Sequence, residues 1–355
     1  MGIVRFDEIA RECRETFKGS FTDMPIVGLE HIEPYDMKLK NYEVNVETTF
    51  TKQFHEGQIL FGRRRAYQHK ACVATFDGIC SGDITVIEPI EGKVNPDLLP
   101  FIIQNDDFFE HAIKGSNGAL SPRVKWEHMA NFELNLPSLA EQKVLAEKLW
   151  AAYEVKQSYL KMIAATEEMV KAQFVEMFKS EDNYEPLENV VVVKDDCRKP
   201  INDGVRGSMK EGELYPYYGA TGVVDYINDY ITDEELLCIA EDCGNYKAGE
   251  DSSYIINGKA WVNNHAHLVK AKECCEIKYL HQYLKITDLM PYVSGTTRLK
   301  LTQKKMKEIP VLLPSIELQN KFVSIAEQAD KSGFELRKSI DAIDKVIKSL
   351  INENL

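Results

Sequence analysis

The chain has 355 residues, of which 44% are hydrophobic, and a formal net charge of −13. This apolar content can form the cores of two domains of ordinary size, and no run approaches the about 18 apolar residues of a membrane-spanning helix, so we expect a soluble, cytoplasmic protein. The eight cysteines include no CxxC pair, which argues against a zinc module and favours reduced thiols.

Residues 1–135 predict a mixed α/β domain with a strand-rich centre. Residues 1–18 favour a short amphipathic helix, and residues 97–114 favour another helix before a Gly-Ser-Asn-Gly loop. Short apolar runs between Gly, Asn and Asp turns predict strands near residues 26–29, 42–46, 58–62, 71–76 and 83–87.

Residues 136–180 predict one long helix. No Gly or Pro interrupts the segment from Leu139 to Lys179. Ser138 and Glu141 form a capping box, which satisfies free backbone donors at a helix start. Apolar side chains at steps of three and four predict a seam against one partner helix. They are Leu149, Tyr153, Leu160, Ile163, Val170, Phe174 and Met177.

Residues 181–312 repeat the plan of the first domain. A tyrosine-rich turn spans residues 215–222, and residues 277–285 favour a late helix. Apolar runs predict strands near residues 190–193, 223–227, 236–240, 254–256 and 260–262.

The last segment, residues 313–355, repeats the first long helix. Residues 136–142 (LPSLAEQ) recur as residues 313–319 (LPSIELQ), and the same offset aligns Gly118 with Gly295. Apolar positions again predict a helical seam, with Gly333 as its only breaker. They are Phe322, Ile325, Ala329, Leu336, Ile340, Ile343, Ile347 and Leu350.

The order domain, helix, domain, helix predicts an α+β fold: two strand-rich α/β domains separated by a two-helix antiparallel coiled coil, with a pseudo-two-fold internal repeat. At about 1.5 Å per residue, such helices hold the domains up to roughly 60 Å apart. Two related domains at a fixed spacing suit two half-sites on duplex DNA, where one turn is about 34 Å. The alternative is a helical hairpin that merely joins two unrelated domains.

The net charge does not suit a nucleic-acid-binding protein, because residues 1–135 and residues 181–312 are each acidic overall. Phosphate binding needs local positive charge or a basic partner. One acid-free basic run comprises Arg63, Arg64, Arg65 and Lys70, and another comprises Arg298, Lys300, Lys304, Lys305 and Lys307. Solvated faces are the alternative explanation for both runs.

Catalytic motifs are missing from the sequence. Asn95-Pro96-Asp97 does not fit a methyltransferase motif, and neither Gly92-Lys93 nor Gly258-Lys259 is followed by the Ser or Thr of a phosphate-binding loop. His265 and His267 could ligate a metal, but the neighbouring asparagines equally suit a polar turn.

The chain resembles the specificity subunit of bacterial and archaeal type I restriction-modification systems. The LPSxxxQ start of each long helix and the Ser-Gly-Thr-Thr loop at residues 294–297 carry the resemblance. Residues 217–222 (YYGATG) and 258–264 (GKAWVNN) support it, and residues 57–61 and 78–83 look like the matching elements of the first domain.

The resemblance covers essentially the whole chain and implies a non-catalytic protein that recognises DNA. Target recognition domain 1 (residues 1–135) and target recognition domain 2 (181–312) would bind the two halves of a bipartite site. The helices (136–180 and 313–355) would form the spacer. Two methyltransferase subunits and the restriction and translocase subunits would assemble on it. S-adenosylmethionine, ATP and Mg²⁺ would belong to those partners, and this chain would hold no cofactor or metal.

We predict DNA-binding residues from their positions along the chain and from their chemistry. Arg suits guanine edges or phosphates, and Lys suits phosphates. Those of the first domain are Arg63, Arg64, Arg65, Tyr67 and Lys70. Those of the second are Tyr218, Gly219, Gly295, Thr296, Arg298, Lys300 and Lys304. A buried core aromatic is the alternative for Tyr218, and a turn glycine with positive φ is the alternative for Gly295. A self-sufficient nuclease or methyltransferase, and an interaction scaffold without a DNA role, are the alternative functions.

Overall fold

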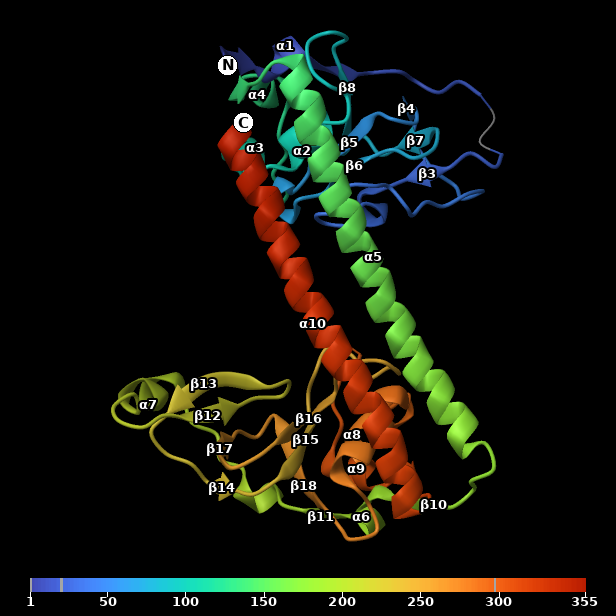
Figure 1. Ribbon diagram of the computed structural model, residues 1–355, viewed down its shortest axis with the longest axis vertical. Coiled ribbons are helices and arrows are strands. Elements are labelled where there is room, and N and C mark those ends of the chain that lie inside the picture. The colour runs from blue at the N-terminus through green and yellow to red at the C-terminus, as the bar shows by residue number, and fades with distance from the viewer. Residues whose placement is uncertain (1, 20–21, 297) are drawn as a thin grey trace. The chain divides into compact units, whose positions relative to one another are not determined.

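The computed structural model describes residues 2–19, 22–296 and 298–355. The chain divides into two compact units: unit one is Met1–Leu160 with Arg337–Leu355, and unit two is Lys161–Leu336. Two long helices, α5 (Leu139–Phe178) and α10 (Ile316–Asn354), each contribute a segment to both units (Figure 1). In the described ranges, we find no helix whose length and apolar content would suit it to cross a membrane.

Besides its segments of the long helices, unit one is rich in short strands. In chain order its elements are β1 (Gly2–Arg5), α1 (Phe6–Ile9), β2 (Ala10–Cys13), β3 (Ile26–Val27), β4 (Lys52–Phe54), β5 (Ile59–Gly62), β6 (Ala71–Val73), β7 (Gly78–Cys80), β8 (Ile84–Pro89), α2 (Leu99–Gln104), α3 (Asp106–Lys114), α4 (Trp126–Met129) and β9 (Glu133–Leu136).

The centre of unit one is a four-stranded antiparallel sheet in the order β2-β8-β5-β6. Side chains alternate between its two faces, as they do on any strand. Ile59 and Phe61 join a core with the helices, whereas Leu60 joins a second core that includes Val27 of the three-stranded sheet β3-β7-β4. Both faces of the sheet are therefore buried.

The predicted helix over residues 1–18 is wrong. Phe6 and Ile9 are buried in a single helical turn, but β1 on one side pairs with β9 and β2 on the other pairs with β8. These pairings join segments far apart in sequence, and such tertiary contacts override a weak local helical period.

Two further predictions in unit one are wrong. The helix predicted over residues 97–114 is split at Asn105, whose side chain accepts a hydrogen bond from Asp107 N (3.2 Å) and so caps α3. Residues 42–46 form no strand, because only Glu43 bridges to a neighbour, Ile26.

Unit two repeats much of this order. Its elements are β10 (Tyr184–Pro186), α6 (Leu187–Val190), β11 (Val191–Val193), α7 (Asp203–Ser208), β12 (Tyr215–Tyr218), β13 (Val223–Ile227), β14 (Thr232–Asp233), β15 (Leu236–Ala240), β16 (Ser253–Ile256), β17 (Lys259–Val262), β18 (Ala266–Ala271), α8 (Ile277–Ile286), α9 (Gln303–Lys307) and β19 (Pro310–Leu312).

The internal repeat predicted from the sequence is confirmed by the topology. The sheet β11-β18-β15-β16 is antiparallel throughout and matches β2-β8-β5-β6 strand for strand. Unit two also has a second sheet, β13-β12-β17-β14, in which β12 and β17 run parallel. This sheet corresponds to β3-β7-β4 of unit one, where β3 and β7 also run parallel and β4 pairs antiparallel with β7 as β14 does with β17. The mixed α/β character of both domains is therefore as predicted, and β13 is an additional strand of unit two.

A buried glutamine joins each domain to its long helix in the same way. Gln142 Oε1 accepts from Asn95 N (2.7 Å), and Gln142 Nε2 donates to Pro137 O (2.8 Å). Gln319 makes the equivalent bonds to Glu276 N (2.8 Å) and to the carbonyl of the preceding Leu-Pro-Ser motif (2.9 Å). The repeated LPSxxxQ motif is thus a structural joint.

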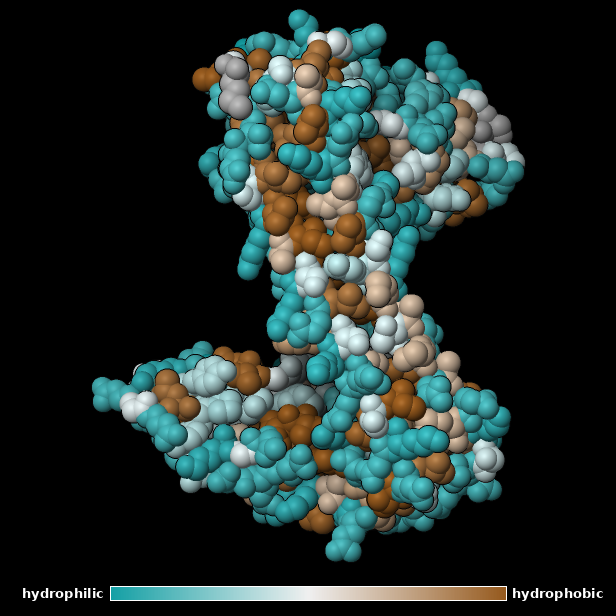
Figure 2. All heavy atoms as spheres, in the orientation of Figure 1, coloured by the Kyte–Doolittle hydropathy of each residue, from teal (hydrophilic) through white to brown (hydrophobic). Residues whose placement is uncertain are grey.

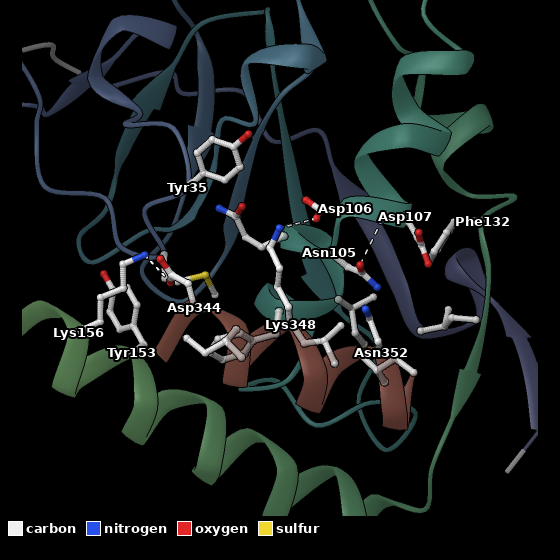
Figure 3. A pocket seen from close by; sticks show the side chains of 18 of the residues that line it. Tyr35, Asn105, Asp106, Asp107, Phe132, Tyr153, Lys156, Asp344, Lys348 and Asn352 are labelled. Atoms are coloured by element: carbon white, nitrogen blue, oxygen red, sulfur yellow. Dashed lines mark hydrogen bonds and ion pairs between the residues drawn. The ribbon is translucent and has the colours of Figure 1, made fainter. Parts of the chain in front are cut away.

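In unit one the two helical segments run antiparallel. Asn135 N donates to Leu355 O (3.0 Å), whereas Lys156, further along α5, pairs with Asp344, which lies earlier on α10 (2.7 Å). Figure 3 shows this pair beside a cleft of about 780 Å³, across which Lys348 of α10 reaches Asp106 of α3 (2.9 Å). Ion pairs and apolar contacts together hold α10 against the first domain.

In unit two the end of α5 packs on the start of α10. Phe174 and Phe178 meet Phe322 with ring centroids 5.3 and 5.7 Å apart. The predicted seam is wrong at Leu160 of unit one, which is 42% exposed. The predicted breaker, Gly333, lies inside the continuous helix α10.

Candidate nucleic-acid interface

The second domain holds an open cleft of about 570 Å³ that collects three of the predicted contact residues. Gly219, Thr296 and Arg298 line it, together with Asn263 and His265. These residues come from the ends of β12 and β17 and from the loop before α9. Loops from several strand ends therefore form the rim of this cleft. Recognition residues usually lie on such loops, which a rigid sheet positions.

Residues 294–300 form a closed loop on this rim. Ser294 N donates to Lys300 O (2.9 Å), and Lys300 N donates to Ser294 O (2.8 Å). Leu301 N then donates to Glu241 O (2.8 Å), directly after β15. These backbone hydrogen bonds tie the loop to the end of the central sheet.

The backbone conformation of this loop requires glycine at position 295. Its φ is +91°, and a Cβ atom at this position would lie 2.2 Å from Arg298 O. The turn-glycine alternative therefore accounts for Gly295, and its close approach to DNA remains a prediction. Thr296 beside it is exposed, and Thr297 lies outside the described residues.

Partly buried acids hold the cations of the loop. Arg298 pairs with Asp242, and Lys300 Nζ lies 3.0 Å from Glu241 Oε1. Burial raises the pKa of Glu241, but hydrogen bonds from Arg198 and Lys300 outweigh it and hold that pKa below its usual range. Both cations are exposed, so a phosphate could compete with the carboxylates for them. Lys304 on α9 is exposed as well.

Tyr218 supports the rim from behind. Its ring stacks on that of Tyr254 with centroids 5.5 Å apart, and Tyr254 OH donates to Gly219 O (2.5 Å). Burial raises the pKa of the Tyr218 hydroxyl. A Cβ on Gly219 would lie 2.9 Å from Val224, so close packing explains this glycine.

In the first domain two of the predicted arginines meet at the equivalent rim. Arg64 Nε donates to Ser121 Oγ (3.0 Å), and its guanidinium lies 3.4 Å from Asp83. Arg65 is left-handed, with φ of 56°, and its N donates to Pro122 O (2.8 Å). Residues 63–65 therefore contact the loop that corresponds to residues 294–300.

The structure does not bring the other three predicted residues of the first domain to one place. Lys70 Nζ donates to Leu29 O (2.7 Å), which engages its charge away from the arginines. Arg63 lines a separate cleft of about 670 Å³ with Lys125. Tyr67 is exposed in the turn after Arg65.

The prediction missed Arg123. Asn117 and Arg123 exchange backbone hydrogen bonds (both 3.0 Å), as Ser294 and Lys300 do. Arg123 Nε lies 2.7 Å from Asp83 Oδ1. The signal was present in the sequence, because the offset that aligns the two LPSxxxQ motifs also aligns Arg123 with Lys300.

The two histidines considered as metal ligands face different acids. His265 Nδ1 lies 2.9 Å from Asp242, and His267 Nδ1 lies 2.7 Å from Asp195. Within the described residues, no group of three or more His, Cys, Asp or Glu side chains is arranged to hold a metal ion.

Comparisons with known proteins agree with this duplicated architecture. The sequence matches the type I restriction modification DNA specificity domain over residues 12–158 and again over residues 187–343. S.HindORF215P of Haemophilus influenzae, whose name describes it as a candidate type I restriction enzyme specificity subunit, is 35% identical over 148 residues, which cover 42% of this chain and 37% of that protein. The EcoDI specificity subunit of Escherichia coli is 26% identical over 151 residues, 41% of this chain and 33% of that protein. The chain therefore spans about a third of the length of these curated relatives.

Solved structures share the fold over nearly the whole chain. The type I restriction-modification S subunit of M. genitalium covers 98% of this chain and 94% of its own, with a TM-score of 0.59 and 13% identity. A chain from a study of assembly and conformational transition of the type I R-M system covers 99% and 97%, with a TM-score of 0.53 and 16% identity. Two successive family matches, one for each duplicated domain, cover most of the sequence, and this chain belongs to the type I restriction-modification DNA specificity family.

Proposed function

We propose that this chain is the specificity subunit of a type I restriction-modification system and that it has no catalytic activity of its own. Each recognition domain reads one half of an interrupted site in duplex DNA, and the long helices set the gap between the halves. One observation carries the proposal. Each domain presents a cation, Arg123 in the first and Lys300 in the second, on equivalent closed loops at the corresponding end of their central sheets.

The proposed contacts are the residues expected from the sequence, with one addition from the structure. In the first domain they are Arg63, Arg64, Arg65, Tyr67 and Lys70, to which we add Arg123. In the second they are Tyr218, Gly219, Gly295, Thr296, Arg298, Lys300 and Lys304. Arginine can bind a guanine edge or a phosphate, and lysine binds phosphate. With a net charge of −13, the affinity depends on these local cations and on basic surface from partners.

The proposed partners are two methyltransferase subunits and the restriction and translocase subunits. S-adenosylmethionine, ATP and Mg²⁺ would bind to them, in the cytoplasm where the DNA lies. Figure 2 shows apolar surface over the α10 segment of unit one, and Val144, Val155 and Val346 of the helices in this unit are exposed. Apolar side chains on an exposed helical face are typical of a protein interface.

The test is exchange of one recognition domain. Residues 1–135 are replaced by the corresponding domain of a relative, the chain is assembled with its methyltransferase, and methylated sites are mapped by sequencing. We expect one half of the site to change and the other half and the gap to persist. Exchange of residues 181–312 is the matched control, and a change of both halves after either exchange contradicts the proposal.

A second assay separates this function from a self-sufficient enzyme. The purified chain alone, incubated with duplex DNA, Mg²⁺ and S-adenosylmethionine, should neither cleave nor methylate. Activity without partners would exclude the role of a non-catalytic reader. Failure to bind any duplex, at any salt concentration and with partners present, would favour a scaffold without a DNA role.

A further inference from the structure

A buried histidine and partly buried charged side chains lie behind the 294–300 loop, and the proposed function does not use the histidine. His267 on β18 is 2% exposed. Its Nδ1 lies 2.7 Å from Asp195 Oδ2, and its Nε2 lies 2.9 Å from the carbonyl oxygen of Leu301. Leu301 directly follows Lys300, the last residue of the loop, so the imidazole touches the point where the loop rejoins the domain.

Hydrogen-bond accounting fixes the charge of this imidazole. A carbonyl oxygen only accepts, so Nε2 carries a proton. Asp195 accepts from Leu268 N (2.9 Å) and Gln303 Nε2 (2.8 Å), and the Arg198 guanidinium lies 3.0 Å away. A carboxyl group surrounded by donors is ionised and accepts, so Nδ1 must donate to it as well. The hydrogen-bond partners of His267 are therefore those of an imidazolium.

The pKa of Asp195 agrees with an ionised carboxylate. Burial raises this pKa, but hydrogen bonds from His267 and Gln303 outweigh burial and hold it below its usual range. Gln303 is the first residue of α9, two positions after Leu301. Asp195 is thereby linked to the loop exit twice, through the imidazole and through Gln303.

A second link runs through Arg198 and Glu241. Arg198 Nη1 lies 2.8 Å from Glu241 Oε2, and Glu241 Oε1 lies 3.0 Å from Lys300 Nζ. Glu241 Oε2 also lies 3.9 Å from Nε2 of the imidazole. The charged groups around His267 are thus Asp195, Arg198 and Glu241, with Lys300 beyond them, and all of them connect to the loop.

We propose that His267 is a buried imidazolium that positions the 294–300 loop, so that recognition by the second domain depends on a charged side chain where the first domain has the uncharged Thr85. For its effect on DNA the inference rests on the function proposed above. The loop itself needs no DNA to be tested. His267 touches no DNA in this proposal and acts through the carbonyl of Leu301.

The first domain supplies the matched control. Ile239 pairs with His267 between β15 and β18, and in the same register Phe61 pairs with Thr85 between β5 and β8. Thr85 is buried but uncharged. Thr85→Val therefore changes the equivalent position without touching a charged network.

The first experiment measures the protonation of His267 in the full-length chain. Nitrogen-15 NMR of labelled histidine rings, assigned with His267→Gln, should show both nitrogens of His267 protonated near neutral pH. A ring with one protonated nitrogen overturns the proposal. This result depends on neither DNA nor any partner, so it separates failure of the inference from failure of the proposed function.

The second experiment measures the loop. Amide hydrogen exchange at Leu301 and Lys300 should accelerate about tenfold or more in His267→Gln, the change expected for loss of a charged hydrogen bond, and should not change in Thr85→Val. With the methyltransferase present, His267→Gln should lose discrimination at the half-site read by the second domain and keep it at the other. Unchanged exchange, or equal loss at both halves, contradicts the proposal.

If His267→Gln fails to fold, Gln303→Ala replaces it. This variant removes one donor from Asp195 and keeps the imidazole. We expect faster exchange confined to residues 294–303, and exchange identical to that of the unmodified chain would overturn the positioning role.

Discussion

The two recognition domains have the same central sheet, but the residues that follow its third strand carry opposite charges. β5 is followed by Arg63 and Arg64, whereas β15 is followed by Glu241 and Asp242. The first residue after each strand nevertheless makes the same bond: Arg63 O accepts from Val124 N (3.0 Å) and Glu241 O accepts from Leu301 N (2.8 Å).

This difference shows that the main-chain bond to the rim loop is the same in both domains, whichever charge the residue after the strand carries. The charges that follow each central strand can reverse without moving the loop. In the first domain Asp83, from another turn, provides the acid that pairs with Arg64 and Arg123. Duplication can therefore conserve the frame of the two domains while each acquires its own pattern of donors and acceptors.

The largest expected effect tests the helix pair of unit two. Phe322 is fully buried between Phe174 and Phe178, and Phe322→Ala should lower the free energy of unfolding by about 3–5 kcal/mol. This free energy is measured by urea unfolding, with hydrogen exchange of unit two as the readout. Val346→Ala, at an exposed position, is the control and should change stability by less than about 0.5 kcal/mol. Equal effects would show that Phe322 is not part of a tight core.

The next comparison uses the paired glycines Gly118 and Gly295. Both have positive φ, which costs a non-glycine residue about 1–3 kcal/mol. A Cβ at Gly295 would lie 2.2 Å from Arg298 O, whereas at Gly118 the nearest atom, Ser121 O, is 3.4 Å away. Gly295→Ala should therefore cost more than Gly118→Ala in thermal unfolding and in binding of its half-site. The reverse order would contradict the structure of the 294–300 loop.

The joints should behave alike. Gln142→Leu and Gln319→Leu each leave a buried backbone N–H and a carbonyl without a partner, and each should cost about 1–3 kcal/mol of stability. Denaturant unfolding of both variants tests whether the duplicated motif has one role. If only one substitution is destabilising, the equivalence of the joints fails.

Arg123 and Lys300 should contribute equally to binding if both contact phosphates. Arg123→Ala and Lys300→Ala should each reduce the slope of log affinity against log salt concentration by about 1. Titrations of a fluorescent duplex at several salt concentrations, with the methyltransferase present, measure the slope. Lys179→Ala is the control, because this exposed lysine at the end of the first long helix is not among the proposed contacts. An unchanged slope for Arg123→Ala would remove that residue from the proposed interface.

The smallest effect concerns pH and Asp83. The hydrogen bond from Arg123 lowers the pKa of Asp83 and outweighs its partial burial. A lowered folded-state pKa gives stability that is present above the unfolded pKa, about 3.9, and is lost as pH falls through the folded-state value. Both arginines are well exposed, so we expect less than about 1 kcal/mol. Asp83→Asn should be less stable than the unmodified chain at about pH 7 and equal to it at about pH 2. A deficit that persists in acid contradicts the assignment.

The helices and the repeat were predictable because their signals are local. Ser138 N donates to Glu141 Oε2 (2.9 Å), as a capping box requires, and α5 begins at Leu139. β13 and β15 lie at residues 223–227 and 236–240, where short apolar runs predicted them. Long-range pairing was not predictable: β1 is a strand because it meets β9 at the other end of the domain.

The candidate site was only partly predictable. Arg298 and Lys300 were found as a basic run, but Asp242 and Glu241, which hold them, lie far away in sequence and join them only in the fold. Lys70 was grouped with the arginines by proximity along the chain, although its side chain turns toward Leu29. Neighbourhood in sequence says nothing about the direction in which a side chain points.

The glutamine joints affect how readily one domain can be exchanged for another during evolution. On the domain side, Gln142 bonds the peptide group of Asn95, and Gln319 bonds those of Cys274 and Glu276. Peptide groups are the same whatever side chains surround them. A domain acquired by recombination can therefore form the same joint, while ion pairs such as Lys348 with Asp106 still depend on its own side chains.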